Sequence, residues 1–273
     1  MNEKLPRKLE PICKPYIWGY EEWMLSDLHD GVEECPLLVK IITARENLSV
    51  QVHPDNEYAM ENEKCSGKTE MWYVLDCEPD ACLYYGLKNR ISAGEFIKRI
   101  KNNTILEVCQ KINVKKGDVF FIPAGMLHAI GRGITVAEVQ QNSNITYRVY
   151  DYHRQDENQN FRPLHIKQAE AVTGFMPPLQ GHRPIGLRTE KEGYYKTLLS
   201  RCSFFQVTRI EVQTVWQKGA SDLHQSLLIL EGNGVLIYED GVMEIQAGDS
   251  IYIPKGGESY QVRGKITFLL SEA

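Results

Sequence analysis

An amide and an imidazole stand two residues apart in the stretch LSVQVHPD, residues 48–55. The stretch is predicted to be a strand, along which side chains alternate between two faces. Gln51 and His53 therefore project side by side from one face. The apolar residues expected on the other face are Leu48, Val50 and Val52. Two polar groups side by side on a stiff element can present ligand atoms to a metal ion, so further ligands are expected elsewhere in the chain.

A carboxylate and a second imidazole supply the missing ligand types. Glu70 opens the predicted strand EMWYVLD, and His128 follows the turn IPAG at residues 122–125. Two imidazoles, a carboxylate and an amide oxygen can hold a catalytic zinc ion and leave a position open for water or substrate. Because the set contains no thiolate, iron, manganese, cobalt and nickel also fit. Each residue alone has an ordinary structural explanation, and only their combination predicts a metal site.

Strands dominate the elements that must position these residues. The chain of 273 residues is long enough for one large β architecture or for two modest domains. Short β-rich segments bounded by turn residues are predicted at 36–43, 48–53, 70–76, 81–86, 118–122, 134–140 and 146–150, and again at 204–213, 226–232, 234–239, 242–247, 250–255 and 266–271.

Helices and tight turns separate some of these strands. Capping residues predict one helix after Ser92, ahead of FIKRI, and another after Thr104, ahead of VCQKI. Pro163 predicts the start of a third helix over HIKQAEAV. The dipeptides Asn233-Gly234 and Asp240-Gly241 each predict a hairpin turn between alternating strands.

One segment of the chain is repeated. GDVFFIPAG at residues 117–125 is echoed by GDSIYIPKG at residues 248–256, and both resemble the second motif of the cupin superfamily. Two such units predict a mainly β bicupin of two jelly-roll barrels, with a small helical insertion and linker helices. The expected parts are an N-terminal catalytic cupin at 1–152 with a helical insertion at about 91–113, a helical or irregular linker at 153–200 and a C-terminal cupin at 201–273.

The two copies of the repeat differ in chemistry. Eleven residues after its first glycine, the N-terminal copy has His128 and the C-terminal copy has Ser259. The second unit has no Q-x-H sequence, and His224 is an isolated histidine there. The N-terminal unit is therefore expected to carry the chemistry, and the C-terminal unit to serve structure, substrate closure or assembly.

Four motifs in order resemble the type I mannose-6-phosphate isomerases in their short bacterial form: LSVQVHPD, GKTEMWYVL, GDVFFIPAGMLHAIG and EVQQNSNITYRVYDY. The resemblance runs from about Pro15 to Tyr152 and weakens in the C-terminal half. It implies a metal-dependent aldose–ketose isomerase that interconverts mannose 6-phosphate and fructose 6-phosphate through a cis-enediolate, with one Zn²⁺ per chain.

The resemblance also implies roles for particular residues. Carried over by motif, the metal ligands are Gln51, His53, Glu70 and His128, and the catalytic or cleft-lining residues are Arg148, Lys68, Glu138 and Lys40. Arg148 keeps its proton and suits a fixed positive donor to an oxyanion or a phosphate. Lys68, Glu138 and a metal-bound hydroxide all remain candidates for the base. Tyr16 and Trp18 match an aromatic segment of the family and are expected either to wall the cleft or to join the core.

The chain departs from the family at two positions near the arginine. Asn144 replaces the usual acidic residue before ITYR, and Tyr152 replaces the usual tryptophan after YD. Neither is a proposed ligand, but both put the packing around Arg148 in question.

Composition limits the partners and the compartment. The formal net charge of −5 gives no basic surplus for nucleic acid. The N-terminus is charged without an apolar core, and no run of about 18 apolar residues predicts a membrane span. Seven cysteines without paired spacing fit free thiols in a reducing cytoplasm. The expectation is a cytoplasmic monomer or homodimer that binds a small sugar phosphate, without nucleic acid or membrane partners.

Two other functions fit parts of the pattern. Two histidines and one carboxylate also form the iron site of cupin dioxygenases, although Gln51 would then fill a fourth position. A non-catalytic bicupin that binds sugar phosphates is the other alternative. Tightly bound iron with oxygen uptake would favour the first, and saturable binding without turnover would favour the second.

Overall fold

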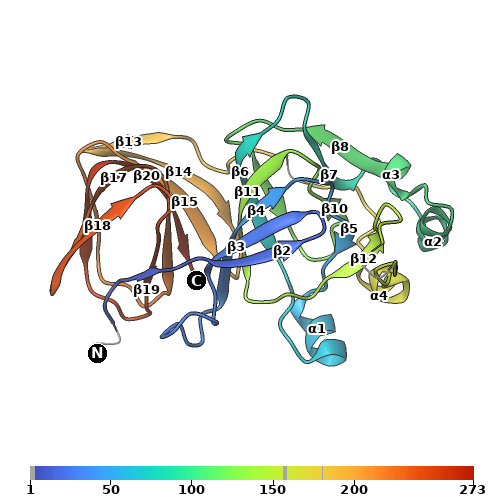
Figure 1. Ribbon diagram of the computed structural model, residues 1–273, viewed down its shortest axis with the longest axis horizontal. Helices are drawn as coiled ribbons and strands as arrows, with labels where there is room; N and C mark the ends of the chain where they lie inside the picture. The colour runs from blue at the N-terminus through green and yellow to red at the C-terminus, as the bar shows by residue number, and fades with distance from the viewer. Residues whose placement is uncertain (1–3, 156–158, 180) are drawn as a thin grey trace. The chain divides into compact units, whose positions relative to one another are not determined.

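The computed structural model describes residues 4–155, 159–179 and 181–273, and the chain divides into two compact, mainly β units (Figure 1). The site unit comprises residues 14–21 and 41–182 and contains all four predicted metal ligands. The second unit comprises residues 1–13, 22–40 and 183–273. The first three residues of the charged N-terminal stretch lie outside the described residues. Within the described residues, no helix has the length and apolarity needed to cross a membrane.

The described residues of the site unit form two sheets and four helices. Strands β2, β3 and β4 each contain residues of both units. The sheet orders are β12-β5-β10-β7-β8 and β2-β3-β4-β11-β6-β9. The strands are β2 (Ile12–Tyr16), β3 (Gly19–Leu25), β4 (Leu37–Ala44), β5 (Val50–Val52), β6 (Glu70–Cys77), β7 (Cys82–Leu87), β8 (Cys109–Asn113), β9 (Val119–Ile122), β10 (His128–Ala129), β11 (Ile134–Gln141) and β12 (Tyr147–Tyr150). The helices are α1 (Asn56–Glu63), α2 (Ala93–Lys101), α3 (Ile105–Val108) and α4 (Ile166–Val172).

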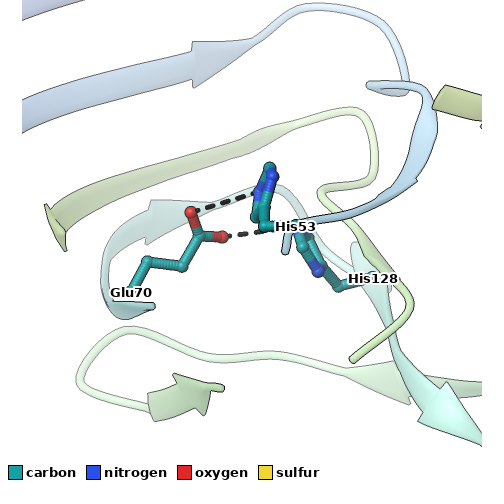
Figure 2. A group of neighbouring side chains, drawn as sticks. All are labelled: His53, Glu70 and His128. Atoms are coloured by element: carbon teal, nitrogen blue, oxygen red, sulfur yellow. Dashed lines mark ion pairs between the residues drawn. The ribbon is translucent and has the colours of Figure 1, made fainter. Parts of the chain in front are cut away.

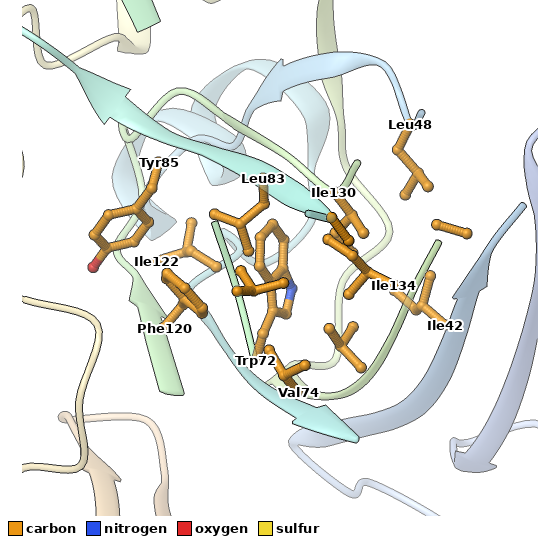
Figure 3. Close-up of a cluster of buried hydrophobic side chains, with 14 of the residues drawn as sticks. Ile42, Leu48, Trp72, Val74, Leu83, Tyr85, Phe120, Ile122, Ile130 and Ile134 are labelled. Carbon is orange, nitrogen blue, oxygen red and sulfur yellow. The ribbon is translucent and has the colours of Figure 1, made fainter. Parts of the chain in front are cut away.

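Alternating strand faces build two cores in the site unit. One core joins residues from both sheets, and Figure 3 shows Trp72 near its middle, close to Leu83 and Ile122. The other joins the opposite face of the five-stranded sheet to helices α2, α3 and α4, and includes Val50 and Val52. Each fully buried large apolar side chain contributes about 1.5–3 kcal/mol relative to exposure. The strands that carry the polar residues are therefore anchored from both sides.

The predicted helices are confirmed at two of three places. Ser92 caps α2 by accepting the Glu95 backbone N–H at 3.1 Å, and α4 lies where Pro163 predicted a helix. At the third place, a helix does begin after Thr104, but it does not continue through VCQKI as expected, because α3 is only four residues long and CQKIN forms β8. The pairing of β8 with β7 satisfies that backbone with ladder hydrogen bonds instead.

The second unit has one nine-stranded sheet. Its main path is β1-β19-β17-β20-β15-β14-β13, while β16 pairs with β20 and β18 pairs with β17. The strands are β1 (Arg7–Leu9), β13 (Thr189–Lys191), β14 (Tyr194–Arg201), β15 (Gln206–Val212), β16 (Val215–Lys218), β17 (Gln225–Tyr238), β18 (Gly241–Gln246), β19 (Ser250–Ile253) and β20 (Tyr260–Glu272). β13 and most of β14 lie within residues 153–200, the segment expected to be helical or irregular.

One of the two predicted hairpin turns is absent from the second unit. A turn does join β17 and β18, but its two residues are Glu239 and Asp240, and Gly241 opens β18 opposite Tyr238. At the other position, β17 runs straight through Asn233-Gly234. A Cβ at Gly234 would lie 2.2 Å from the Arg263 carbonyl oxygen of β20. This glycine therefore allows close approach to the partner strand and does not form a turn.

The sequence repeat is matched by the same turn in both units. Gly117 and Gly248 have φ angles of 92° and 94°, in the region that favours glycine. The following aspartates, Asp118 and Asp249, each accept a backbone N–H from the residue three positions earlier, at 3.0 and 2.8 Å. Each turn then leads into a buried strand, β9 or β19. The sequence repeat is thus also a structural repeat.

Candidate metal centre

His53, Glu70 and His128 converge in the site unit as three buried side chains (Figure 2). His53 Nε2 lies 3.5 Å from Glu70 Oε2, and His128 Nε2 lies 3.3 Å from Glu70 Oε1. The ligand atoms of a tetrahedral zinc site, each about 2.0–2.2 Å from the ion, are roughly 3.3–3.5 Å apart. Among the described residues, this is the one group of at least three histidine, cysteine, aspartate or glutamate side chains whose ligand atoms all lie within 4.8 Å of one another.

Short strands and one turn deliver the three residues to one point. His53 follows β5, Glu70 is the first residue of β6, and His128 is the first residue of β10. The turn before β10 ties the elements together, since the Gly125 N–H donates to the His53 carbonyl at 2.8 Å. The ligands are thus fixed through backbone hydrogen bonds as well as through side-chain packing.

The hydrogen bonding of His128 shows that the centre suits a cation. Its Nδ1 lies 2.8 Å from the Met126 carbonyl oxygen, which can only accept, so Nδ1 carries the proton. Nε2 of the neutral ring then directs a lone pair at the Glu70 carboxylate. Neither His128 Nε2 nor His53 Nδ1 has a hydrogen-bond partner among the described residues. Acceptors that face one another in a buried site are stabilised by a positive ion between them.

The charge states also match those of metal ligands. Burial, and after it the nearby Lys68 charge, lower the pKa of His53 to about 3 against the opposing effect of Glu70. Burial likewise lowers the pKa of His128. Burial raises the pKa of Glu70, but Lys68 and His53 outweigh it and hold that pKa well below its usual range. Two neutral imidazoles and one carboxylate are the forms that bind divalent metals.

This arrangement predicts a pH dependence for the metal-free protein. Unfolded His53 takes up a proton near pH 6.5, whereas in the folded protein its pKa is about 3. Between these values the unfolded state binds more protons, so the free energy of unfolding falls as the pH is lowered, by up to about 1.4 kcal/mol per pH unit from this group. Urea unfolding of metal-free protein should show this slope, and His53→Asn should make it shallower. An unchanged slope in the variant would contradict the assignment.

Lys68 and Glu138 extend the centre on one side. Lys68 Nζ lies 2.9 Å from Glu70 Oε2 and 3.9 Å from Glu138 Oε1, and all three side chains are buried. Burial lowers the pKa of Lys68, but the carboxylates of Glu70 and Glu138 raise it by more, so its net pKa lies above the ordinary value. The structure therefore brings two predicted catalytic residues to the histidine–glutamate cluster, with the lysine as a cation.

Gln51 and Arg148 lie on neighbouring strands beside the cluster. Gln51 stands opposite His128 of β10 and opposite Arg148 of β12 in the strand register. Residues opposite one another in a ladder share a face of the sheet. Gln51 as fourth ligand stays a prediction, which this register supports.

Lys40 belongs to the residue range of the second unit. It is 3% exposed, and its Nζ lies 5.3 Å from the centre of the Trp23 ring. A solvated strand edge, the ordinary explanation for a lysine on a strand, does not apply to so buried a side chain. Its expected role in the cleft stays a prediction.

Of the two N-terminal aromatic residues, Trp18 joins the core and Tyr16 does not. Trp18 joins the core of the site unit at 5% exposure, whereas Tyr16 is 42% exposed and stacks on it with ring centres 4.8 Å apart. Burial raises the pKa of Tyr16 to about 12, with Glu21 adding to the rise and Lys68 opposing it. Tyr16 is therefore the member of the pair that lies within electrostatic range of Lys68.

The sequence patterns did not identify three groups that hold residues of the site in place. Trp72 Nε1 donates to Glu138 Oε2 at 2.7 Å, and its ring meets His128 edge-on at 5.4 Å. The Met126 carbonyl fixes the His128 ring, and the Gln141 side chain accepts the Thr69 N–H at 2.9 Å. Only Trp72 left a signal, because it stands two residues after Glu70 on the same predicted strand face.

Comparison with known proteins agrees with this geometry. Residues 18–79 match the family "Phosphomannose isomerase type I, catalytic domain", and residues 195–273 match "Mannose-6-phosphate isomerase, cupin domain". Mannose-6-phosphate isomerase ManA of Bacillus subtilis (strain 168) is 33% identical over 261 residues, 93% of this chain and 80% of that protein. The chain belongs to the type I mannose-6-phosphate isomerase family.

Further relatives support the family assignment. The mannose-6-phosphate isomerase of Streptococcus mutans is 35% identical over 238 residues, 87% of this chain and 74% of that protein. The crystal structure of a Bacillus subtilis mannose 6-phosphate isomerase has a TM-score of 0.87 at 29% identity and covers 97% of this chain and 99% of its own. A putative mannosephosphate isomerase from Archaeoglobus fulgidus, at 18% identity, shares the fold with a TM-score of 0.75 over 98% of this chain and 96% of its own. The predicted family and the mainly β fold with a cupin domain are confirmed.

Proposed function

We propose that this protein interconverts mannose 6-phosphate and fructose 6-phosphate, using one Zn²⁺ held by Gln51, His53, Glu70 and His128. The observation that carries the proposal is the buried group of two histidines and one glutamate whose facing lone pairs suit a cation. Relatives that are 33–35% identical over most of the chain are named mannose-6-phosphate isomerases.

The reaction sets clear requirements for the side chains. A proton moves between C2 and C1 while carbonyl and hydroxyl exchange places, and a cis-enediolate carries negative charge between the two steps. When bound, zinc supplies Lewis-acid stabilisation of a sugar oxygen that develops this charge. The protein must add fixed cations for the remaining charge and a group that carries the proton.

We assign these two tasks to Lys68 and Glu138. Lys68 is a buried cation 2.9 Å from the metal-ligand carboxylate, so it suits a donor to an oxyanion near the ion. Glu138 is a buried carboxylate oriented by the Trp72 indole, so it suits a proton carrier. In this proposal Lys68 holds charge and Glu138 moves the proton.

Arg148 and Lys40 complete the proposed cleft. Arg148 shares a strand register with Gln51, and a guanidinium binds anionic oxygens through a rigid fork of donors. Lys40 is the second proposed anion-binding cation. Both are assigned to substrate oxygens and not to the metal.

The structural repeat supports a bicupin in which one copy has lost its metal site. The two Gly-Asp turns have the same geometry, but the offset that places His128 in one copy places Ser259 in the other. We therefore assign catalysis to the site unit and a structural role to the second unit. A cytoplasmic monomer or homodimer completes the proposal.

A coupled assay that follows fructose 6-phosphate formation from mannose 6-phosphate tests the function directly. Elemental analysis of the same protein should give about one zinc per chain. Turnover that disappears with a chelator and returns with Zn²⁺ is the expected result. A fully metallated protein without turnover would overturn the proposal, and tightly bound iron with oxygen uptake would replace it with a dioxygenase.

A further inference from the structure

Arg148 is held by the short segment that precedes helix α4. Its Nη1 donates to the Pro163 carbonyl at 3.1 Å. Its backbone N–H donates to His165 Nδ1 at 3.1 Å, and its carbonyl accepts the His165 N–H at 2.8 Å. Arg148 Nε is buried without a hydrogen-bond partner among the described residues. Where the guanidinium lies thus depends on where residues 163–165 lie.

A buried carboxylate fixes that segment. Asp151 is 6% exposed and accepts two hydrogen bonds from Arg162, Nε to Oδ2 at 2.7 Å and Nη2 to Oδ1 at 2.5 Å. This paired geometry is the strong form of an arginine–carboxylate contact. Arg162 directly precedes Pro163, whose carbonyl receives Arg148. The Asp151 carboxylate is therefore connected to the Arg148 guanidinium through Arg162 and Pro163.

The same carboxylate also ties the segment to the strand of the metal ligands. Asp151 Oδ1 accepts from Arg154 Nη2, and Arg154 Nη1 donates to the Asn47 carbonyl at 2.5 Å. Asn47 lies just before β5, which carries Gln51 and leads to His53. One aspartate thus joins β12, the segment before α4 and the start of β5.

The backbone of the turn after Asp151 is strained, as expected for a turn whose conformation is fixed by contacts with other side chains. Tyr152 and His153 have φ angles of 56° and 55°, in the left-handed region that non-glycine residues seldom adopt. Such conformations persist where surrounding contacts determine them, and they concentrate at functional sites. Here the turn brings Arg154 back onto Asp151, and the Arg154 guanidinium lies 5.4 Å from the centre of the Tyr152 ring.

The Asp151 carboxylate balances part of the positive charge of the arginines around it. Arg148, Arg154 and Arg162 bring three positive charges, of which the Asp151 carboxylate offsets one. Without that carboxylate the three guanidinium groups repel one another, and Arg162 loses both of its hydrogen bonds to Asp151, which releases the segment that carries the Pro163 carbonyl. The two remaining charges leave the group attractive to a phosphate or an oxyanion.

We propose that Asp151 is a positioning residue that aims the Arg148 guanidinium at the substrate anion by fixing Arg162 and the Pro163 carbonyl. The proposal rests on the proposed function for the role of Arg148. The position of the guanidinium itself is measured independently of turnover.

The test is Asp151→Asn, which keeps the shape of the side chain and removes its charge. A crystal structure of the variant should show the Arg148 guanidinium displaced from the Pro163 carbonyl. The value of kcat/KM for mannose 6-phosphate should fall about 10–100-fold at full zinc content, since small misplacements cost rates of this order. Whichever of kcat and KM changes in Arg148→Ala should change in Asp151→Asn.

A double-mutant cycle separates positioning from general destabilisation. In an Arg148→Ala background, Asp151→Asn should cost little more, because its effect passes through the missing guanidinium. The matched control is Glu211→Gln in the second unit, where one carboxylate also pairs with two arginines, Arg188 and Arg209. The control should lose no activity.

Two results would overturn the proposal. One is an unmoved guanidinium in the Asp151→Asn crystal, and the other is a full additional loss from Asp151→Asn in the Arg148→Ala background. Wild-type protein without turnover would contradict the proposed function instead. In that case the crystal structure alone decides whether Asp151 positions Arg148.

Discussion

Replacing His128 with alanine is expected to remove the metal and the activity together. The ring is a proposed metal ligand, and its Nε2 lies 3.3 Å from the Glu70 carboxylate. Losing a ligand from a catalytic metal site removes Lewis-acid stabilisation worth several kcal/mol. At about 1.4 kcal/mol per factor of ten, turnover should fall at least about 10³-fold. Elemental analysis and the coupled isomerase assay on the same sample measure both effects.

The matched control for this variant is His224→Ala. His224 is partly buried, and its Nδ1 lies 2.7 Å from the Tyr252 hydroxyl in the second unit. The proposed function gives it no catalytic part, so its removal should leave zinc content and turnover near the wild-type values. A His128→Ala protein that keeps stoichiometric zinc would show that the cluster is not the metal site.

The proposed ligands could be named from the sequence because each stands within a short sequence pattern. Gln51 and His53 share a strand face by alternation, and His128 stands at a fixed distance from a glycine turn. Glu70 was predictable as the opening residue of a strand in the family motif. These are local relations, and the structure brings both histidines to the Glu70 carboxylate, at 3.5 Å for His53 and 3.3 Å for His128.

The supporting contacts depend on the fold and left little trace in the sequence. The Met126 carbonyl that orients His128 is a backbone group, present at every position of the chain. The Trp72–Glu138 hydrogen bond joins residues 66 positions apart, through the pairing of β6 with β11. Asp151 acts through an arginine eleven residues later. No local period encodes such pairs.

The errors of the sequence analysis have the same origin. Leu48 was expected on the face of Val50 and Val52, but β5 begins only at Val50 and Leu48 packs in the other core. The helix through VCQKI gave way to pairing with β7. In both cases a contact with a distant segment accompanies the change, since the Leu48 N–H donates to the Ile130 carbonyl at 2.9 Å and β8 pairs with β7, and local propensity does not reveal such contacts.

Replacing Arg148 with alanine is expected to leave the zinc in place and still lower turnover about 10²–10³-fold. Arg148 lies across the ladder from Gln51 and contacts Pro163 and His165, not the histidine–glutamate cluster. Removing one fixed donor to a developing oxyanion typically costs this much in rate. Burial lowers the pKa of Arg148, and the charges of Arg162 and Arg154 add to this, so the group is a cation held near other cations. An anionic substrate relieves that repulsion when it binds.

The comparison variant for Arg148→Ala is Arg188→Ala. Arg188 is an exposed arginine that pairs with Glu211 at 2.9 Å and lies 3.5 Å from the centre of the Tyr195 ring, so it too loses a guanidinium with a defined partner. Exposed ion pairs contribute little to stability, and this one has no role in the proposed reaction. Elemental analysis and steady-state kinetics should show zinc near one per chain in both variants and a kinetic defect in Arg148→Ala alone. Full activity of Arg148→Ala would remove the arginine from the mechanism and leave Lys40 and Lys68 to bind the substrate anion.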